Sequence, residues 1–406
     1  MQFVVEFVNS TLNYLLFTIG STAFVWLPFA LFLTAWNLWR YYTRVLNINS
    51  IKWVLLEVKL PRELLKSPQA MEVIAPIFSQ NYEGNLWDQY WKGVVRAWFS
   101  LEIVSLGGEI HFYVRTQKFF KNLIEAQFYS QYPDIEMREV EDYVNQIPPY
   151  GTPGSDWGMW GAEWKLAKED AYPIKTYVDY GLHDNPKEEH KIDPMTPMLE
   201  YLSSISVGEQ IWIQILVMMS RDRFHKPGTW FKKQDWRKNS ADLVKKLMKR
   251  DEPREVGKFP ERLSPGEEET VEAVERSLSK LGLDTGIRTI YLAKKDRYNA
   301  LNQVGIMNSF KQYSSLNLNG FKTALRTGFE YKWQDPWGKR VEKMKRKVFD
   351  AYVRRSWFYP PHVRKPFVLN VEELATIYHF PGEVARTPTL ERVESKRGEP
   401  PSNLPL

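Results

Sequence analysis

The chain has 406 residues with a formal net charge of +6, 15% aromatic residues including 16 Trp, and no cysteine. The lack of cysteine excludes disulfides, thiol nucleophiles and thiolate metal ligands, and the aromatic content indicates packed cores rather than disorder. The sequence contains no GxxxxGK[ST], GxSxG or HExxH pattern, so it carries no recognisable machinery for nucleotide hydrolysis. We therefore expect no catalytic residue, no cofactor and no metal site.

The first predicted element is the uncharged run from Phe7 to Trp39, which lies between Glu6 and Arg40. About 20 apolar residues suffice for a helix to cross a bilayer, and Trp, Tyr and Arg residues follow the run. The pattern predicts a transmembrane anchor over residues 1–45, in the inner (cytoplasmic) membrane, with the amino terminus outside and the later domains cytoplasmic. A cleaved signal peptide and a long helix in the core of a soluble protein are the alternatives.

Residues 46–147 predict the first folded unit. A β-rich run at 51–60 is followed by a helix from Ser67-Pro68, then two strands joined at Gly107-Gly108, another helix and a last strand. This β-α-β-β-α-β order is typical of a ferredoxin-like α+β unit.

Residues 155–298 repeat the order of strands and helices after a linker rich in proline and glycine. We interpret them as a second, degenerate ferredoxin-like α+β unit that carries a helical insertion at 221–262. The predicted fold class is thus α+β, with one transmembrane helix, two ferredoxin-like units and a helical carboxy-terminal region.

The insertion 221–262 contains fourteen Lys or Arg against seven Asp or Glu, a net charge of +7. Trp230, Phe231 and Trp236 lie among the cations, a composition that suits phosphate contacts and base stacking. Contact with anionic lipid and a merely solvated face are the alternatives. The predicted basic surface consists of Lys232, Lys233, Arg237, Lys238, Lys245 and Lys246.

The region 299–365 is predicted to be helical. From Trp337 onward, apolar residues recur every three or four positions among many Lys and Arg, which predicts a basic amphipathic helix. Such a helix either packs on its own domain with a charged face exposed, or lies on a membrane surface.

The tail 366–406 contains Phe367–Pro381, which reads FVLNVEELATIYHFP, and a later run, Lys396–Pro405, which reads KRGEPPSNLP. Both resemble the segment that precedes the motor domain in membrane-anchored ATPases of the conjugative, type IV secretion class. The resemblance implies that this tail docks a motor supplied by another chain; the alternative is a flap over its own core. The implied docking residues are Leu369, Asn370, Glu372, Glu373, Leu374, Ile377, Tyr378 and Phe380.

Together these patterns favour a non-catalytic single-pass membrane protein that docks a cytoplasmic hexameric ATPase of a secretion or conjugation apparatus in trans. The alternative is a membrane-tethered protein that binds nucleic acid, such as DNA, through the basic insertion. Anionic lipid as a partner, and a homo-oligomeric state, are left open.

Overall fold

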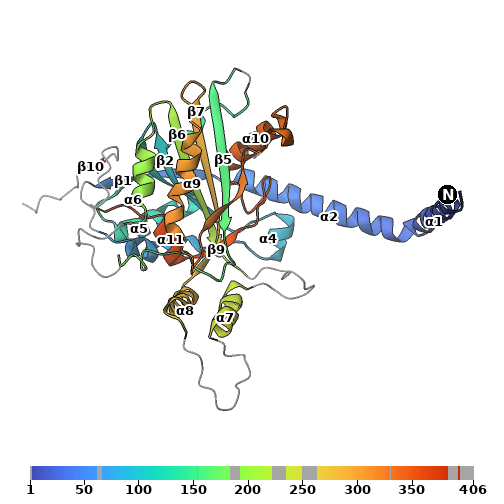
Figure 1. Cartoon of the computed structure of the whole chain (residues 1–406), viewed down its shortest axis with the longest axis horizontal. Coiled ribbons are helices and arrows are strands. Elements are labelled where there is room, and N and C mark those ends of the chain that lie inside the picture. The colour runs from blue at the N-terminus through green and yellow to red at the C-terminus, as the bar shows by residue number, and fades with distance from the viewer. Residues whose placement is uncertain are drawn as a thin grey trace, which may run out of the picture. The chain divides into compact units, whose positions relative to one another are not determined.

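The computed structural model describes residues 2–61, 66–152, 154–182, 193–221, 235–248, 263–329, 331–382 and 392–393 (Figure 1). The chain divides into two compact units. The first contains residues 1–51 and 82–95, and the second contains residues 52–81 and 96–406.

The first unit consists of three helices: α1 (Gln2–Ser21), α2 (Ala23–Ser50) and α4 (Leu86–Trp91). Aromatic side chains join α2 to α4. The ring of Trp36 stacks on Tyr90 with 5.8 Å between centroids, and the indole Nε1 of Trp39 donates to the Tyr90 carbonyl at 3.2 Å. A capping box between Asn85 and Asp88 begins α4.

The predicted transmembrane anchor at 1–45 is wrong. The uncharged run is divided between α1 and α2 around Thr22, and each helix includes polar positions such as Asn13 and Asn37. Among the described residues, no helix combines the length and the apolar character needed to cross a membrane. The predicted localisation, a single-pass protein of the inner membrane, depended on that anchor and is therefore not supported.

In the described residues, the second unit is built on one large antiparallel sheet of nine strands, β1 to β9, to which the short strand β10 adds in parallel. The central order is β1-β3-β2-β6-β7-β5-β8; β4 and β10 pair with β1, and β9 pairs with β7. The strands are β1 (Trp53–Pro61), β2 (Trp98–Leu106), β3 (Glu109–Gln117), β4 (Glu136–Val140), β5 (Trp157–Leu166), β6 (Glu209–Met219), β7 (Gly282–Lys294), β8 (Phe321–Arg326), β9 (Phe367–Asn370) and β10 (Arg392–Val393).

The two halves of this sheet have the same strand order. The first half runs β4-β1-β3-β2 and the second runs β8-β5-β7-β6. Strands β2 and β6 pair from Trp98 opposite Met218 to Leu106 opposite Gln210, so the halves share one sheet. The predicted fold class, an anchor followed by two ferredoxin-like units, is therefore corrected to an α+β protein with one continuous sheet. The physical reason is that β2 is buried along almost its whole length and gains a second set of ladder hydrogen bonds from β6.

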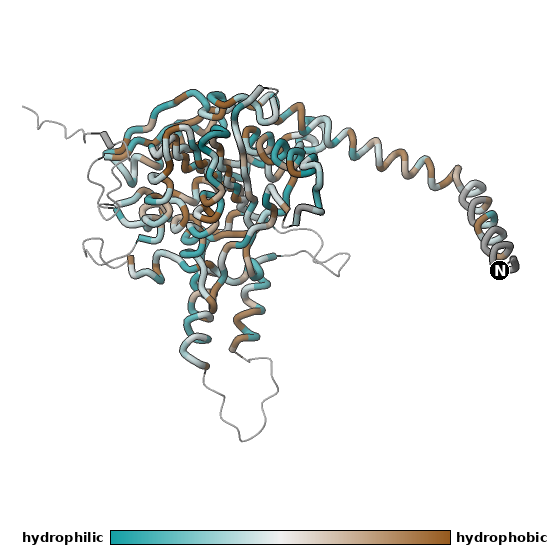
Figure 2. Tube along the Cα trace, turned by 45° about the horizontal axis from the view of Figure 1, so that its top comes forward, coloured by the Kyte–Doolittle hydropathy of each residue, from teal (hydrophilic) through white to brown (hydrophobic). Residues whose placement is uncertain are grey.

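Helices cover both faces of the sheet, and Figure 2 shows apolar residues along the strands and along the helices that cover them. The larger core contains side chains of α3 (Gln69–Ile74), α5 (Lys121–Gln131), α6 (Thr196–Ser203), α9 (Leu301–Ser309) and α11 (Val371–Ile377). The smaller core, on the other face, contains side chains of α10 (Lys339–Val353). Helices α7 (Trp236–Leu247) and α8 (Pro265–Leu278) pack on each other and project together from the sheet (Figure 1).

Single turns of 3-10 helix complete the fold. They are η1 (Ala75–Phe78), η2 (Lys118–Phe120), η3 (Tyr143–Gln146), η4 (Lys311–Tyr313) and η5 (Lys332–Gln334).

Candidate functional site

A break in strand pairing along one edge of β7 marks the candidate site. Arg288 of β7 pairs with Glu163 of β5, whereas Thr285 pairs with Phe367 of β9. The pairing of β5 with β8 shifts in register between Glu163 and Trp164, an irregularity of the kind that bends a strand. The edge of β7 is thus shared between two strands, and a cavity lies where one gives way to the other.

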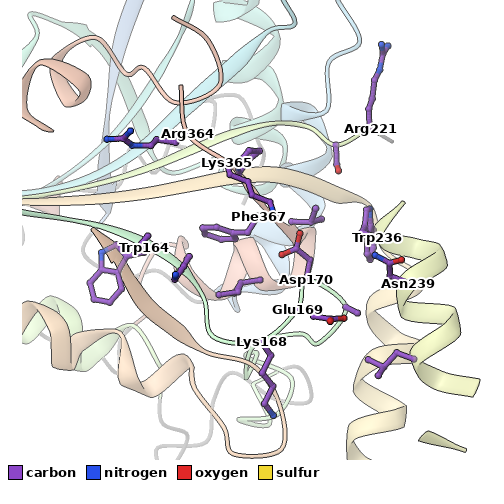
Figure 3. A pocket seen from close by; sticks show the side chains of 18 of the residues that line it. Trp164, Lys168, Glu169, Asp170, Arg221, Trp236, Asn239, Arg364, Lys365 and Phe367 are labelled. Atoms are coloured by element: carbon purple, nitrogen blue, oxygen red, sulfur yellow. The ribbon is translucent and has the colours of Figure 1, made fainter. Parts of the chain in front are cut away.

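This cavity has a volume of about 760 Å³, within the usual range of roughly 300–1,000 Å³ for ligand pockets. Figure 3 shows lining side chains from four segments: β5 with the loop after it, the residues that follow β6, α7, and the segment that enters β9. Segments more than 200 residues apart in sequence therefore line the same cavity.

The floor of the cavity is a buried ion pair network around Glu163. The Arg288 guanidinium donates to Glu163 Oε1 at 3.0 Å, and Arg364 Nε donates to Oε2 at 2.7 Å. Burial lowers the pKa of Arg288, while the charge of Glu163 opposes that effect. Both oxygens of Glu163 are occupied by cations, so this carboxylate is a structural anion rather than an available general base.

Beyond the cavity, Glu163 is the end of a polar row across the centre of the sheet. Glu102, Gln214, Arg288 and Glu163 lie directly opposite one another on β2, β6, β7 and β5. Arg355 binds Glu102 through two hydrogen bonds of 2.9 and 3.0 Å. Burial raises the pKa of Glu102, but the charge of Arg355 and the hydrogen bonds lower it to about 2.

Four aromatic residues are among those that line the cavity: Trp164, Trp236, Trp357 and Phe367. Trp164 stacks on Phe310 with 4.1 Å between centroids. Trp357 is 2% exposed, and its indole N–H has no hydrogen-bond partner within the described part of the chain. A Cβ at Gly286 would lie 2.3 Å from the Trp357 ring, so only glycine permits this ring position.

Trp236, the first residue of α7, lines the cavity on the side of the predicted insertion. A Cβ at Gly282 would lie 2.6 Å from its indole, so this ring holds the start of α7 against the start of β7. Asp235 caps α7 by accepting from the Arg237 backbone N–H at 3.0 Å.

The lining carries more basic than acidic side chains. Lys168 is positioned by hydrogen bonds from its Nζ to the carbonyls of Leu316 and Asn317, at 2.8 and 3.0 Å. Six basic against four acidic side chains give the lining a formal net charge of 6 − 4 = +2. The basic residues are Lys165, Lys168, Arg221, Lys246, Arg364 and Lys365, and the acidic ones are Glu163, Glu169, Asp170 and Asp242.

The structure describes four of the six residues of the predicted basic surface. Lys232 and Lys233 lie outside the described residues. Arg237, Lys238, Lys245 and Lys246 are exposed on α7, and of these four Lys246 lines the cavity.

The eight predicted docking residues occupy the core of this chain. Leu369, Asn370, Glu372, Glu373, Leu374, Ile377, Tyr378 and Phe380 are each at most 3% exposed. They form β9, α11 and the residues that follow, in the layer that also contains α3 and α5. This burial supports the alternative interpretation, in which the segment covers its own core.

Two of these residues are buried carboxylates with different partners. Glu372 forms ion pairs with Arg276 at 3.3 Å and Lys280 at 2.7 Å. Glu373 accepts from the backbone N–H groups of Asn370 and Ile174, each at 2.8 Å. Burial and the nearby charge of Glu372 raise the pKa of Glu373 to about 8.

Sequence reasoning missed the cavity, because its lining comes from segments that are distant from one another in sequence. One signal was present: Glu163 is the first charged residue in the otherwise uncharged start of β5, WGMWGAEWKL. A charge inside a buried strand requires a partner and so marks a site to inspect.

Comparison with known proteins gives one family. Residues 56–392 match the model of a family described as a domain of unknown function, DUF8128. A search of curated proteins finds no match to this sequence. The matched range includes every residue that lines the cavity.

Proposed function

The chain belongs to the DUF8128 family, and we propose that it is a binding protein that holds single-stranded nucleic acid in the cavity beside α7. The observation that carries this proposal is the half-buried ring of Trp236 beside a cavity that six basic side chains line. Aromatic rings stack on unpaired bases, and cations at the rim neutralise phosphates.

The ligand is proposed to be single-stranded because a paired base is shielded by its neighbours in the stack, whereas an unpaired base can enter a pocket. In Figure 3, Phe367 lies near the middle of the cavity, Trp236 lies at the α7 side and Lys168 points outward at the rim. An inserted base would thus meet the Trp236 ring, and its flanking phosphates would meet Lys168, Lys246 and Lys365.

The charge state of the floor supports binding rather than acid–base chemistry. Glu163 lies between Arg288 and Arg364, and both of its carboxylate oxygens already accept hydrogen bonds from them. In this proposal, Glu163 positions the two arginines by its hydrogen bonds, and the positions of the arginines in turn fix the shape of the cavity.

Docking of an ATPase by residues 369–380 is the less favoured proposal. Those side chains would have to leave the core of the protein before they could contact a partner. Exposing so many buried apolar groups is costly, at roughly 1.5–3 kcal/mol for each large side chain.

The test is fluorescence anisotropy of a labelled 20-nucleotide DNA strand with the full chain, measured over a series of salt concentrations. We expect the variant Lys246→Glu/Lys365→Glu to bind at least about tenfold more weakly. The slope of log affinity against log salt should fall by about 1.4, since each lost phosphate contact on a single strand contributes about 0.7. Trp236→Ala should weaken binding with little change of that slope.

The matched control is Lys118→Glu/Lys311→Glu, which makes the same charge change at two exposed lysines outside the cavity lining. Unchanged binding in both cavity variants, or equal losses in the cavity and control variants, would contradict the proposal. Circular dichroism and thermal melts establish that each variant is folded.

A further inference from the structure

The segment before α10 exposes three aromatic rings within seven residues. Tyr331 is 58% exposed, Trp333 is 75% exposed and Trp337 is 82% exposed. The rings of Tyr331 and Trp333 stack on each other with 6.3 Å between centroids. Large aromatic side chains gathered on a surface in this way are typical of an interaction site.

Helix α10 is held in one orientation by its apolar face. Val348, Phe349 and Tyr352 are buried in the smaller core, and the Tyr352 hydroxyl is 2.7 Å from that of Tyr143. The opposite face of α10 therefore stays exposed.

That exposed face carries a row of lysines. Lys339, Lys343 and Lys347 recur at intervals of four residues and are all exposed. A rise of 1.5 Å per residue separates successive members by about 6 Å along the helix axis. The exposed Arg340 and Arg346 add to the same helix.

The acidic residues of α10 do not neutralise this row. Glu342 pairs with Lys345 at 3.2 Å and accepts from the Tyr150 hydroxyl. Asp350 pairs with Arg354 at 2.8 Å and with His362 at 2.6 Å. Among the described residues, Lys339, Lys343 and Lys347 form no ion pair, so their charges are available to an anionic partner.

We infer that the three aromatic residues 331, 333 and 337, together with Lys339, Lys343 and Lys347, form a second surface that binds single-stranded nucleic acid. We call it the α10 surface. The lysines contact successive phosphates, and the tryptophans stack on unpaired bases beside them. A regular row of cations next to exposed rings fits a strand that offers phosphates and bases in regular alternation.

The α10 surface is distinct from the cavity. The first turns of α10 lie beside residues that precede β5, since Tyr150 bonds to Glu342 and a Cβ at Gly151 would meet Arg346. The cavity lies at the other end of β5, and Figure 1 shows α10 well separated from α7. The inference shares its ligand class with the proposed function but none of its residues, so each can fail without the other.

The experiment compares two variants of the full chain by anisotropy with a labelled 20-nucleotide DNA strand and with the corresponding duplex. Lys339→Glu/Lys343→Glu/Lys347→Glu should lower the salt slope by about 2. Trp333→Ala/Trp337→Ala should weaken binding of the single strand at least about tenfold and leave duplex binding unchanged. All five residues are exposed, so the variants are expected to fold.

The control variant Lys66→Glu/Lys118→Glu/Lys311→Glu makes the same change of net charge elsewhere on the protein. If both α10 variants bind the strand as this control does, the inference is overturned, whatever the cavity variants do. If the α10 variants lose binding while Lys246→Glu/Lys365→Glu does not, the inference stands and the proposed function falls. Flotation with vesicles containing phosphatidylserine gives a further outcome: α10-dependent lipid binding without binding of the strand would overturn the inference.

Discussion

Two buried polar regions, on opposite faces of the sheet, shift the pKa of a carboxyl group in opposite directions. Under α10, Glu102 lies in a polar row with Arg355, and its pKa is about 2. In the layer of α11, Glu373 is as deeply buried, and its pKa is raised to about 8. Both side chains are at most 3% exposed, so burial itself does not explain the difference.

The difference comes from the partners that are buried with each carboxylate. Glu102 receives two hydrogen bonds from a guanidinium, whereas Glu373 receives its hydrogen bonds from two backbone N–H groups and lies near another acid, Glu372. A full positive charge offsets the loss of hydration, and two amide dipoles beside a negative charge do not. The two faces therefore respond differently to mutation and to pH.

The largest expected effect comes from removing the cation on the α10 face. Arg355→Met leaves Glu102 and Asp142 without their guanidinium, and we expect the free energy of unfolding to fall by about 3–5 kcal/mol. Arg355 has a φ of 50°, and Met shares that strain, so the comparison isolates the charge. The measurement is urea denaturation at pH 7. The exposed neighbour Arg354→Met is the control, with an expected change within about 0.5 kcal/mol; a loss below 1 kcal/mol for Arg355→Met would contradict the comparison.

The second prediction concerns the pH dependence on the α11 face. The pKa of Glu373 is about 8 in the folded protein and near 4.5 when unfolded, so the folded state binds the extra proton between these values. Stability contributed by Glu373 is complete below about pH 4.5 and is lost as the pH rises through about 8. We expect wild-type protein to lose a few kcal/mol relative to Glu373→Gln between pH 5 and 8. Parallel curves of stability against pH for the two proteins would contradict this prediction, because they would mean that Glu373 is ionised in the folded protein over this whole pH range.

The third prediction concerns His379, which lies 3.1 Å from Asp193 in the same layer. Burial alone would lower the pKa of His379, but the carboxylate of Asp193 and the carbonyl of Ala375 raise it above its ordinary value. Its stabilising contribution is complete below the unfolded pKa near 6.5 and disappears as the pH rises through the higher folded value. His379→Gln should therefore cost about 1.5–3 kcal/mol at pH 6 and less at pH 9, by chemical denaturation. An equal cost at both pH values would indicate a neutral imidazole.

The smallest effect is expected from one hydroxyl of the α10 face. Tyr352→Phe removes the hydrogen bond to the Tyr143 hydroxyl, which still donates to Glu102 at 2.8 Å. We expect a loss of about 0.5–1.5 kcal/mol because the ring volume is kept and no buried charge is exposed. A thermal melt suffices to measure it, and a loss comparable to that of Arg355→Met would mean that the network depends on the phenol rather than on the charge.

Several local elements could be predicted from sequence. The strands on either side of Gly107-Gly108 form the hairpin β2–β3, and both glycines have positive φ, at 63° and 100°. Asn370 is of a residue type favoured at the start of a helix, and it caps α11 by accepting from the Glu373 backbone N–H at 2.8 Å. The predicted basic amphipathic helix is α10, with its apolar side on the sheet. The prediction of a transmembrane anchor was also local, but it was wrong. The length of the uncharged run does not indicate the helix break near Thr22.

The sequence by itself determined the hairpin, the cap and the amphipathic helix, because turn residues, capping residues and helical periodicity act over fewer than about ten residues. Tertiary structure alone decided three other features: the joining of two half-sheets through β2 and β6, the burial of α11, and the cavity between β5, α7 and β9. Each depends on strand register between segments that are far apart in sequence. No local pattern could specify which apolar strand would pair with which, or which charged side chains would become buried as a result.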